Sequence, residues 1–465
     1  MSGRSDVYTR RGVLRSAAAA VLCGTSVAPL ATGCVVAPVT LPIEPPFDAP
    51  PPPTPQAPIP TRCVDLAALA AGVPADAVRG APPPLVAPVF LGAFESSMHR
   101  RWDGERLDLI AATRHDAFAE ADYRRLVEAG LSACRDATRW PRIERRPGRT
   151  ALGSFLPMVR AARRAGIHVM WDLCHYGWPD HVDVFSPAFV TTFGRYARRI
   201  AEVLDGESGE VWICPINEIS FLAWAAGDRR LMYPYAARRG LEMKRNLVRA
   251  ACVAMGEVLD VCPRARLLLC DPVIHLAARP DHPEEAAVVQ AYRDGQFQAW
   301  DWIAGRGEPD LGGDPRFLDV IGVNYYRNNQ TFDDGTFIPG DHPLYRPLSL
   351  ILGEVWERYR RPILVGETGI EDALRPAWLR YVAGEVGLAM HGGCGLHGIV
   401  WSPIVNHPGW DDARHCHNGL WDYPDRHGRR ERYEPLMDTM WALAPYLLRL
   451  RAKAGLGGPG AGAPG

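Results

Sequence analysis

Short apolar runs alternate with longer amphipathic segments over most of the chain. The apolar runs are four to eight residues long and lie at 88–93, 131–134, 167–174, 211–216, 266–270, 319–323, 362–366 and 397–402. Between and after them, apolar residues recur three or four positions apart over 119–129, 151–165, 187–204, 243–261, 284–304, 347–359, 376–391 and 434–452. Short runs that are apolar throughout are typical of parallel strands buried on both faces, and the wider spacing is typical of helices with one buried face.

Eight strand–helix units in a row predict an α/β fold, a (β/α)8 TIM barrel, which we place at residues 85–453 as a single domain. An open doubly wound sheet is the alternative. That sheet usually carries a Gly-rich phosphate-binding loop after its first strand, and the segment Gly92-Ala93-Phe94-Glu95 is not such a loop. In a barrel, reactive groups gather at the C-terminal ends of the strands.

The N-terminal segment, residues 1–34, resembles a twin-arginine export signal. Arg10 and Arg11 precede a mostly apolar, Ala-rich stretch over 17–31. This stretch is shorter than the ~20 residues that span a bilayer comfortably. Leu30 and Cys34 resemble the ends of a lipobox in which the leucine stands one place early. The protein is therefore expected to be exported, either periplasmic or anchored to the cell envelope through lipidated Cys34; a basic tail without an export role is the remaining alternative.

Two segments of biased composition flank the predicted barrel. Residues 35–84 are rich in proline, which favours a semi-rigid spacer, and 62–84 leaves room for one short helix. Residues 454–465 consist mainly of Gly, Ala and Pro and are predicted to be disordered.

The charge and the cysteine content exclude several classes of function. A formal net charge of −1 gives no basis for binding nucleic acid or an anionic membrane surface. None of the 11 Cys residues lies in a CxxC pair, so a zinc or thioredoxin-like site is not expected, and no cofactor is predicted. Cys134, Cys174, Cys214 and Cys270 fall inside apolar runs and are predicted to be buried thiols. Nothing in the sequence indicates the oligomeric state.

Polar side chains follow the predicted strands, where a barrel places its chemistry. They are Glu95, His99, Arg135, His175, Asn217, Glu218, Asp271, Asn324, Tyr325, Tyr326, Glu367, Trp401, Asn406 and His407. Glu218 and Glu367 follow the fourth and seventh strands, which face each other across part of the barrel mouth. Cleavage of a glycosidic bond needs one carboxylic acid to protonate the leaving oxygen and one carboxylate to attack or to activate water. We therefore predict that these two glutamates are catalytic and that donors such as Arg135 and Tyr326 keep one of them ionised.

Six segments in the same order resemble glycoside hydrolase family 1, the β-glucosidase and β-galactosidase family of clan A. Asn217-Glu218 and Glu367-Thr368-Gly369 resemble its two catalytic motifs. Its remaining motifs resemble residues 92–97 (GAFESS), 135–143 (RDATRWPRI), 322–326 (GVNYY) and 401–402 (WS). The resemblance covers roughly 88–445, and it implies a retaining β-glycoside hydrolase that acts on carbohydrate.

The resemblance also implies a role for each matched residue. Glu218 corresponds to the acid/base and Glu367 to the nucleophile. The substrate-binding positions are His99 in place of a sugar-binding Gln, Arg135 and Tyr326 beside the nucleophile, His175, Asn217 for the sugar 2-hydroxyl, Asn324 in the sixth-strand motif, and Trp401 as a stacking floor.

The chain departs from the family after the eighth strand. The family has a Glu there that grips outer sugar hydroxyls, but this chain reads Pro403-Ile404-Val405-Asn406-His407-Pro408-Gly409-Trp410 without one. The sequence therefore supports the chemistry and leaves the sugar, the linkage, and exo or endo action open. The loops 327–346 and 403–433 are rich in Asp and His but lack a fixed ligand spacing, so no metal site is predicted.

Three other functions remain open from the sequence. A transglycosylase or endo-glycanase would use the same two glutamates. A non-catalytic carbohydrate-binding barrel would bind sugar but would have lost its catalytic activity. A metal-dependent barrel hydrolase would use His175 and Asp271.

Overall fold

The computed structural model describes residues 58–74, 77–80, 85–207, 211–412 and 414–454. The predicted export signal, most of the Pro-rich segment and the tail after 454 lie outside these residues. Within the described part of 35–84 there are two short helices, α2 (Leu66–Ala70) and α3 (Ala77–Gly80), which contact α15. None of the helices in the described ranges combines the length and the apolar composition needed to cross a bilayer.

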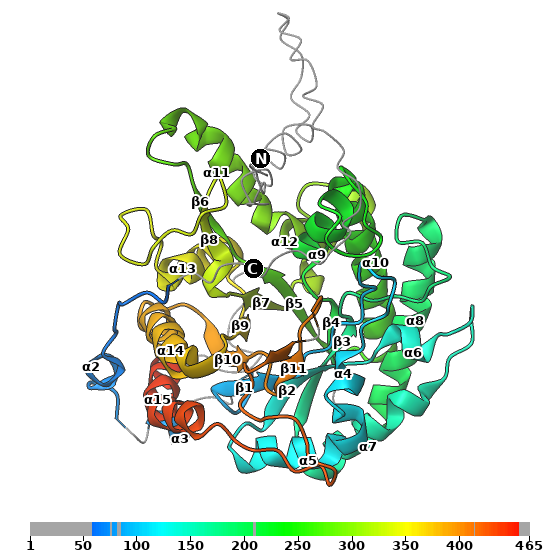
Figure 1. Ribbon diagram of the computed structural model, residues 1–465, viewed down its shortest axis with the longest axis horizontal. Helices are drawn as coiled ribbons and strands as arrows, with labels where there is room; N and C mark the ends of the chain where they lie inside the picture. The colour runs from blue at the N-terminus through cyan, green and yellow to red at the C-terminus, as the bar shows by residue number, and fades with distance from the viewer. Residues whose placement is uncertain (1–57, 75–76, 81–84, 208–210, 413, 455–465) are drawn as a thin grey trace, which may run out of the picture.

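Eight parallel strands form a closed barrel in the order β1-β10-β9-β7-β5-β4-β3-β2. Figure 1 shows them at the centre of the molecule with helices on all sides. The strands are β1 (Phe90–Ala93), β2 (Ala133–Ala137), β3 (His168–Cys174), β4 (Trp212–Ile216), β5 (Arg266–Pro272), β7 (Val320–Asn324), β9 (Ile363–Thr368) and β10 (Leu396–Trp401). The predicted (β/α)8 barrel is confirmed, and each of the eight apolar runs becomes one of its strands.

Four strands continue past the end of their apolar runs. β2 continues to Ala137, β5 to Pro272, β7 to Asn324 and β9 to Thr368. Arg135 and Glu367 therefore lie within strands and not after them, and their side chains are set by the alternation of a strand. Two short pairings stand outside the barrel, β6 (His275–Ala277) with β8 (Gln330–Phe332) and β11 (His407–Pro408) with β12 (His415–Cys416).

The helices follow the strands as the apolar spacing predicts. The long ones are α5 (His115–Glu128), α7 (Leu156–Ala165), α8 (Pro187–Glu207), α10 (Gly240–Val261), α13 (Leu348–Tyr359), α14 (Arg375–His391) and α15 (Glu434–Lys453). Shorter helices are α4 (Leu109–Ala112), α6 (Trp140–Ile143) and α9 (Ile219–Leu222), which continues as a π-helical turn over Ala223–Asp228.

The helix predicted over 284–304 is interrupted. It forms as α11 (Ala286–Asp294) and α12 (Gln298–Ile303), with a 3-10 turn at Gly295–Phe297 between them. Gln296 in this turn is buried and accepts a hydrogen bond from Ile274 N at 2.8 Å. The break therefore satisfies the backbone just beyond β5, a long-range contact that apolar spacing cannot predict.

Two apolar layers fill the molecule. Alternate residues of the strands point into the barrel, including Met170, Trp212, Cys214, Leu268 and Leu364. The residues between them point outward into a larger layer shared with the helices. Parallel strands buried on both faces in this way explain why each run is apolar throughout.

Arg451 of α15 ties the last helix to the bottom of the barrel. Its guanidinium donates to Val86 O (3.0 Å), Ala87 O (2.7 Å) and Pro88 O (3.2 Å) ahead of β1, and to His397 O (2.7 Å) in β10. Burial lowers its pKa to about 10, so these carbonyls have to stabilise a desolvated charge.

We expect Arg451→Met to lower the free energy of unfolding by about 3 kcal/mol, because it leaves several buried carbonyls without a donor. Activity at permissive temperature should be unchanged, because the bottom of a barrel supports stability and not chemistry. Urea denaturation measures the first and steady-state kinetics the second. Arg449→Met is the matched control, since Arg449 makes one long hydrogen bond, to Pro445 O at 3.4 Å. Equal destabilisation by the two variants would contradict this account.

Candidate active site

The C-terminal ends of the strands bring polar side chains into one mouth, as the barrel topology requires. They come from β2, β3, β7 and β9 and from the residues just after β1, β3 and β4, and they are Glu95, Arg135, Asp172, His175, Asn217, Glu218, Asn324 and Glu367. All but Glu95 and His175 are less than 10% exposed. The chemistry of the site is therefore carried by groups held away from bulk water.

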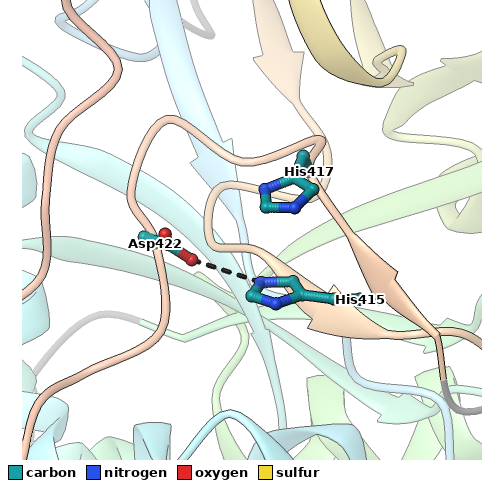
Figure 2. Close-up of side chains that lie close together, drawn as sticks. All are labelled: His415, His417 and Asp422. Atoms are coloured by element: carbon teal, nitrogen blue, oxygen red, sulfur yellow. Dashed lines mark ion pairs between the residues drawn. The ribbon is translucent and has the colours of Figure 1, made fainter.

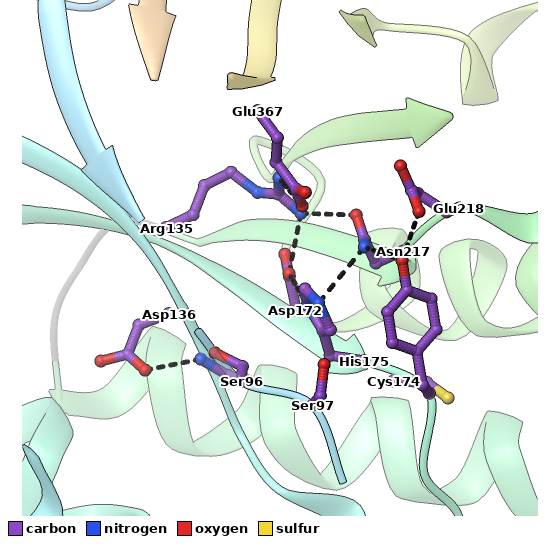
Figure 3. Close-up of polar contacts among 12 residues, drawn as sticks. Ser96, Ser97, Arg135, Asp136, Asp172, Cys174, His175, Asn217, Glu218 and Glu367 are labelled. Atoms are coloured by element: carbon purple, nitrogen blue, oxygen red, sulfur yellow. Dashed lines mark hydrogen bonds and ion pairs between the residues drawn. The ribbon is translucent and has the colours of Figure 1, made fainter. Parts of the chain in front are cut away.

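Arg135 is the hub of this cluster. Its Nη1 donates to Glu367 Oε1 at 2.7 Å and to Gly366 O at 2.9 Å. Its Nη2 donates to Asp172 Oδ2 and to Asn217 Oδ1, each at 2.8 Å. Figure 3 shows the guanidinium beside Glu367 of β9, Asp172 of β3 and Asn217, which directly follows β4. The side chain is almost fully buried, so its charge depends on the two carboxylates.

Two glycines make room for side chains of the neighbouring strands. A Cβ on Gly366 would lie 2.7 Å from Asn324 Oδ1 and 3.0 Å from Cys270 Sγ, and a Cβ on Gly322 would also meet that sulfur. Glycine at both positions therefore leaves the space that Asn324 and Cys270 occupy.

Glu367 accepts hydrogen bonds on both carboxylate oxygens. Arg135 donates to Oε1, and the hydroxyl of Tyr326 donates to Oε2 at 3.1 Å. Donors of this kind favour a carboxylate anion, the form that a nucleophile needs.

Glu218 has the opposite environment. Burial and then the nearby charge of Glu367 raise its pKa to about 8. Asn324 Nδ2 donates to its Oε1 at 2.9 Å, and the hydroxyl of Tyr176 donates to its Oε2. At neutral pH Glu218 therefore keeps its proton while Glu367 is held by a cation. Two carboxyl groups with environments that differ in this way suit an acid and a nucleophile.

A chain of contacts joins Asp172 to the mouth. Asp172 Oδ2 is 2.9 Å from His175 Nδ1, and His175 Nε2 is 3.4 Å from Asn217 Nδ2. Burial opposes the charge on His175, but Asp172 outweighs it and raises the pKa of the imidazole. Asn217 Nδ2 also donates to the hydroxyl of Tyr176 at 3.2 Å, so the amide joins this chain to the tyrosine beside Glu218.

His99 and Trp401 lie at the site but contact neither glutamate within the described part of the chain. The ring of His99 meets Trp410 edge-on with centroids 5.1 Å apart, and burial lowers the pKa of His99 to about 4. Trp401 has no exposed surface, and its indole donates to Asn418 O at 2.9 Å. The stacking role inferred for Trp401 stays a prediction, whereas Trp410 beside His99 is partly exposed.

The sequence analysis missed two residues of the cluster, Asp172 and Tyr176. Asp172 was missed because it lies inside an apolar run. An acidic residue in a strand that is buried on both faces is nevertheless a signal, because a buried carboxylate needs a cation beside it. Tyr176 follows His175 with a left-handed backbone (φ 63°), and this turn carries its hydroxyl to Glu218. No local sequence feature predicts that turn.

Three side chains of the loop 403–433 gather on the rim, His415, His417 and Asp422 (Figure 2). His415 Nε2 lies 3.3 Å from Asp422 Oδ1, and the two imidazoles are stacked with centroids 4.3 Å apart and planes 13° from parallel. A metal ion lies near the plane of each imidazole that binds it, and two nearly parallel planes do not meet close to the rings. The arrangement is thus a stacked pair and not a formed metal site.

The alternative metal site of His175 and Asp271 is not assembled. His175 contacts Asp172 and Asn217, whereas Asp271 accepts from Ser220 N at 3.0 Å. Neither belongs to the His415 group, which among the described residues is the only set of three or more ligand side chains close enough to share an ion.

Comparison with solved structures finds the same barrel. A family 1 β-glucosidase from Thermotoga maritima is similar with a TM-score of 0.64 and 15% identity, over 78% of this chain and 99% of that one. The same protein in complex with glucoimidazole gives a TM-score of 0.62 at 16% identity over 77% and 98%. The AHE enzyme from Alicyclobacillus herbarius gives 0.63 at 16% identity over 76% and 98%. No family model and no curated protein matches the sequence.

This chain has the fold of the family 1 β-glucosidases. The resemblance carried by the six sequence segments is thus confirmed at the level of the fold. At about 15% identity, the likeness by itself does not extend to substrate or mechanism.

We expect kcat/KM to fall on the alkaline side as Glu218 loses its proton, with an apparent pKa near the value of about 8 given above. Hydrogen bonding from Tyr176 lowers the pKa of Glu218. Tyr176→Phe should therefore move the alkaline limb to higher pH, because the ionised form loses a donor. Initial rates on an aryl glycoside between roughly pH 5 and pH 10 measure the alkaline limb in both proteins. An alkaline limb that stays in place in the variant would argue against Glu218 as the acid.

Proposed function

We propose that this protein is a retaining β-glycoside hydrolase. The observation that carries the proposal is the asymmetric pair of glutamates at one mouth, with Glu367 bound by Arg135 and Tyr326 and Glu218 kept protonated by burial. The sugar-like ligand of the similar T. maritima β-glucosidase, glucoimidazole, fits a carbohydrate substrate.

In the first step, a carboxylate oxygen of Glu367 attacks the anomeric carbon and the bond to the leaving oxygen breaks. Glu218 gives its proton to that oxygen, so the aglycone leaves as a neutral alcohol. The sugar is now esterified to Glu367, which has lost its negative charge. Since that charge is one cause of the raised pKa of Glu218, the pKa falls and Glu218 becomes able to act as a base.

In the second step, Glu218 takes a proton from water as the water oxygen attacks the anomeric carbon. The ester bond breaks and Glu367 returns as a carboxylate in contact with Arg135. Two displacements restore the β configuration. Asn217 Nδ2 makes two long contacts, 3.4 Å to His175 Nε2 and 3.2 Å to the Tyr176 hydroxyl, and in this proposal it donates to the sugar 2-hydroxyl in place of one of them.

We expect Glu367→Ala to lower kcat on an aryl β-glycoside by roughly 10⁴-fold or more, because no covalent intermediate can form. Glu218→Ala should lower it by roughly 10²–10⁴-fold on substrates that need protonation. Azide should rescue both variants, yielding an α-glycosyl azide with the first and a β-glycosyl azide with the second. The products are assigned by proton NMR.

Glu371→Ala is the matched control for these variants. It removes another glutamate just beyond β9, one whose carboxylate is paired with Arg414 at 2.6 and 2.7 Å. It should keep activity within tenfold of the native enzyme, about 1.4 kcal/mol of barrier. Labelling of Glu367 by a 2-fluoro glycoside, read by mass spectrometry, excludes a non-catalytic barrel. Transfer of the sugar to an added acceptor in preference to water would favour the transglycosylase alternative.

We also propose that residues 1–34 direct export, with the mature protein periplasmic or attached to the membrane through Cys34. Replacing Arg10 and Arg11 together by Lys should leave the full-length protein inside the cell, whereas Arg15→Lys should not. Cys34→Ser should shift the exported protein from the membrane fraction to the soluble fraction if Cys34 carries the lipid. Cell fractionation and immunoblotting measure each outcome, and unchanged export in the double variant would contradict the signal.

A further inference from the structure

Glu95 follows β1 and presents one free carboxylate oxygen to the mouth. Its Oε1 accepts from Ser97 N at 3.0 Å and from Ser97 Oγ at 2.5 Å. Its Oε2 accepts from no side chain or amide among the described residues, and it is not sealed off from solvent. Glu95 is partly exposed, whereas Phe94, Ser96 and the residues up to His99 are buried. The fold thus anchors one oxygen and leaves the other open.

The surroundings keep Glu95 charged. Burial raises its pKa, but the nearby His407 and His175, together with the hydrogen bonds from Ser97, outweigh burial and lower it. Both nitrogens of His407 are engaged, Nδ1 with Pro408 O at 2.7 Å and Nε2 with Asn418 Nδ2 at 2.9 Å. His407 therefore leaves Oε2 of Glu95 free.

The barrel order places Glu95 away from the acid. β1 lies between β10 and β2, and β2 and β3 separate it from β4, whose end carries Glu218. The leaving group must lie beside Glu218, and the anomeric carbon beside Glu367. With the anomeric carbon there, the ring atoms furthest from it can reach the segment after β1 that carries Glu95 and His99. Trp410 meets the rings of both His99 and Tyr176, so it lies between this segment and the side chain that donates to Glu218.

We propose that Glu95 is a specificity-determining residue whose Oε2 accepts a hydrogen bond from a distal hydroxyl of a neutral sugar. The proposal rests on the proposed function for the placement of the anomeric carbon. Because Oε2 of Glu95 is open and the carboxyl is kept charged, it repels a sugar that carries its own carboxylate at the distal position. The substrate class is a β-glycoside of a neutral pyranose, not a uronide.

The test compares the full-length protein with Glu95→Gln, which preserves the size of the side chain and the acceptor that faces Ser97. Substrates are the best neutral aryl β-glycoside and its 3-, 4- and 6-deoxy analogues. For the native protein, one deoxy analogue should lose about 10- to 150-fold in kcat/KM, the usual worth of a hydrogen bond to a charged group. Relative to the native protein, Glu95→Gln should lower kcat/KM on the parent glycoside by most of this factor. On that deoxy analogue it should change kcat/KM little.

A merely structural role for Glu95 predicts a different pattern. Glu95→Gln would then slow the parent and every deoxy analogue by the same factor, and this result would overturn the proposal. Glu371→Gln serves as the control, since it changes a rim glutamate that is already paired with Arg414. The relative rate on the matching aryl glucuronide should rise in Glu95→Gln, because one repulsive charge is gone, and no rise would also count against the proposal.

Two independent measurements separate this inference from the proposed function. Covalent labelling of Glu367 by a 2-fluoro glycoside reports on catalysis and does not require Glu95. Calorimetric binding of the methyl β-glycoside and its deoxy analogues reports on Glu95 and does not require catalysis. If Glu367 is labelled but the glycoside and its deoxy analogues bind equally well, only the role of Glu95 is refuted. If binding discriminates between them but Glu367 is not labelled, only the hydrolase is refuted.

Discussion

A buried guanidinium in the mouth of the barrel is the constraint on which the rest of the site depends. Arg135 has almost no contact with water, so its charge has to be stabilised by acceptors brought from several strands. Asp172 and Glu367 supply the negative charge, and Asn217 and a backbone carbonyl supply the remaining acceptors. The same contacts hold the carboxylate of Glu367 and the side chain of Asn217, the residue directly before Glu218. Stability of the cation and alignment of the chemistry are therefore one requirement and not two.

The difference between the two glutamates follows from this arrangement. Arg135 is next to Glu367, and Glu218 receives only the neutral donors Asn324 and Tyr176. The ionised partner is thus chosen by position relative to the cation, and its charge then helps to keep a proton on the other. Because the pKa of Glu218 depends partly on the charge of Glu367, any step that neutralises Glu367 also changes the acidity of Glu218. One electrostatic coupling can in this way serve both halves of a double displacement.

Much of the fold and the position of the two glutamates could be predicted from the sequence, because each strand and helix of the barrel has a local pattern of apolar residues. Strands buried on both faces are apolar throughout, so all eight were visible, and Glu218 and Glu367 stood out as acids at strand ends. Asp172 and Tyr176 could not be found in the same way. Arg135, the cation that stabilises the buried carboxylate of Asp172, lies on another strand. The left-handed backbone at Tyr176 precedes Gly177, where an added Cβ would collide with Met98. The break at Gly295 has the same origin, a buried side chain serving the backbone of a distant strand.

The residues proposed for catalysis and those proposed for sugar selectivity lie on different parts of the fold. The groups around the scissile bond belong to strands or their first following residues, where the barrel hydrogen bonds restrict them, and they keep the pattern of the resembled family. The groups around the outer part of the sugar lie on the segment after β1 and the loop after β10, which the barrel restrains less. Adjacent strands β1 and β10 pair through Gly92 and Trp401, so a carboxylate on either segment reaches the same arc of the mouth. In the proposed hydrolase, a chain that lacks the acid after β10 and carries Glu95 after β1 can thus alter its contacts with the sugar without disturbing the network around Arg135.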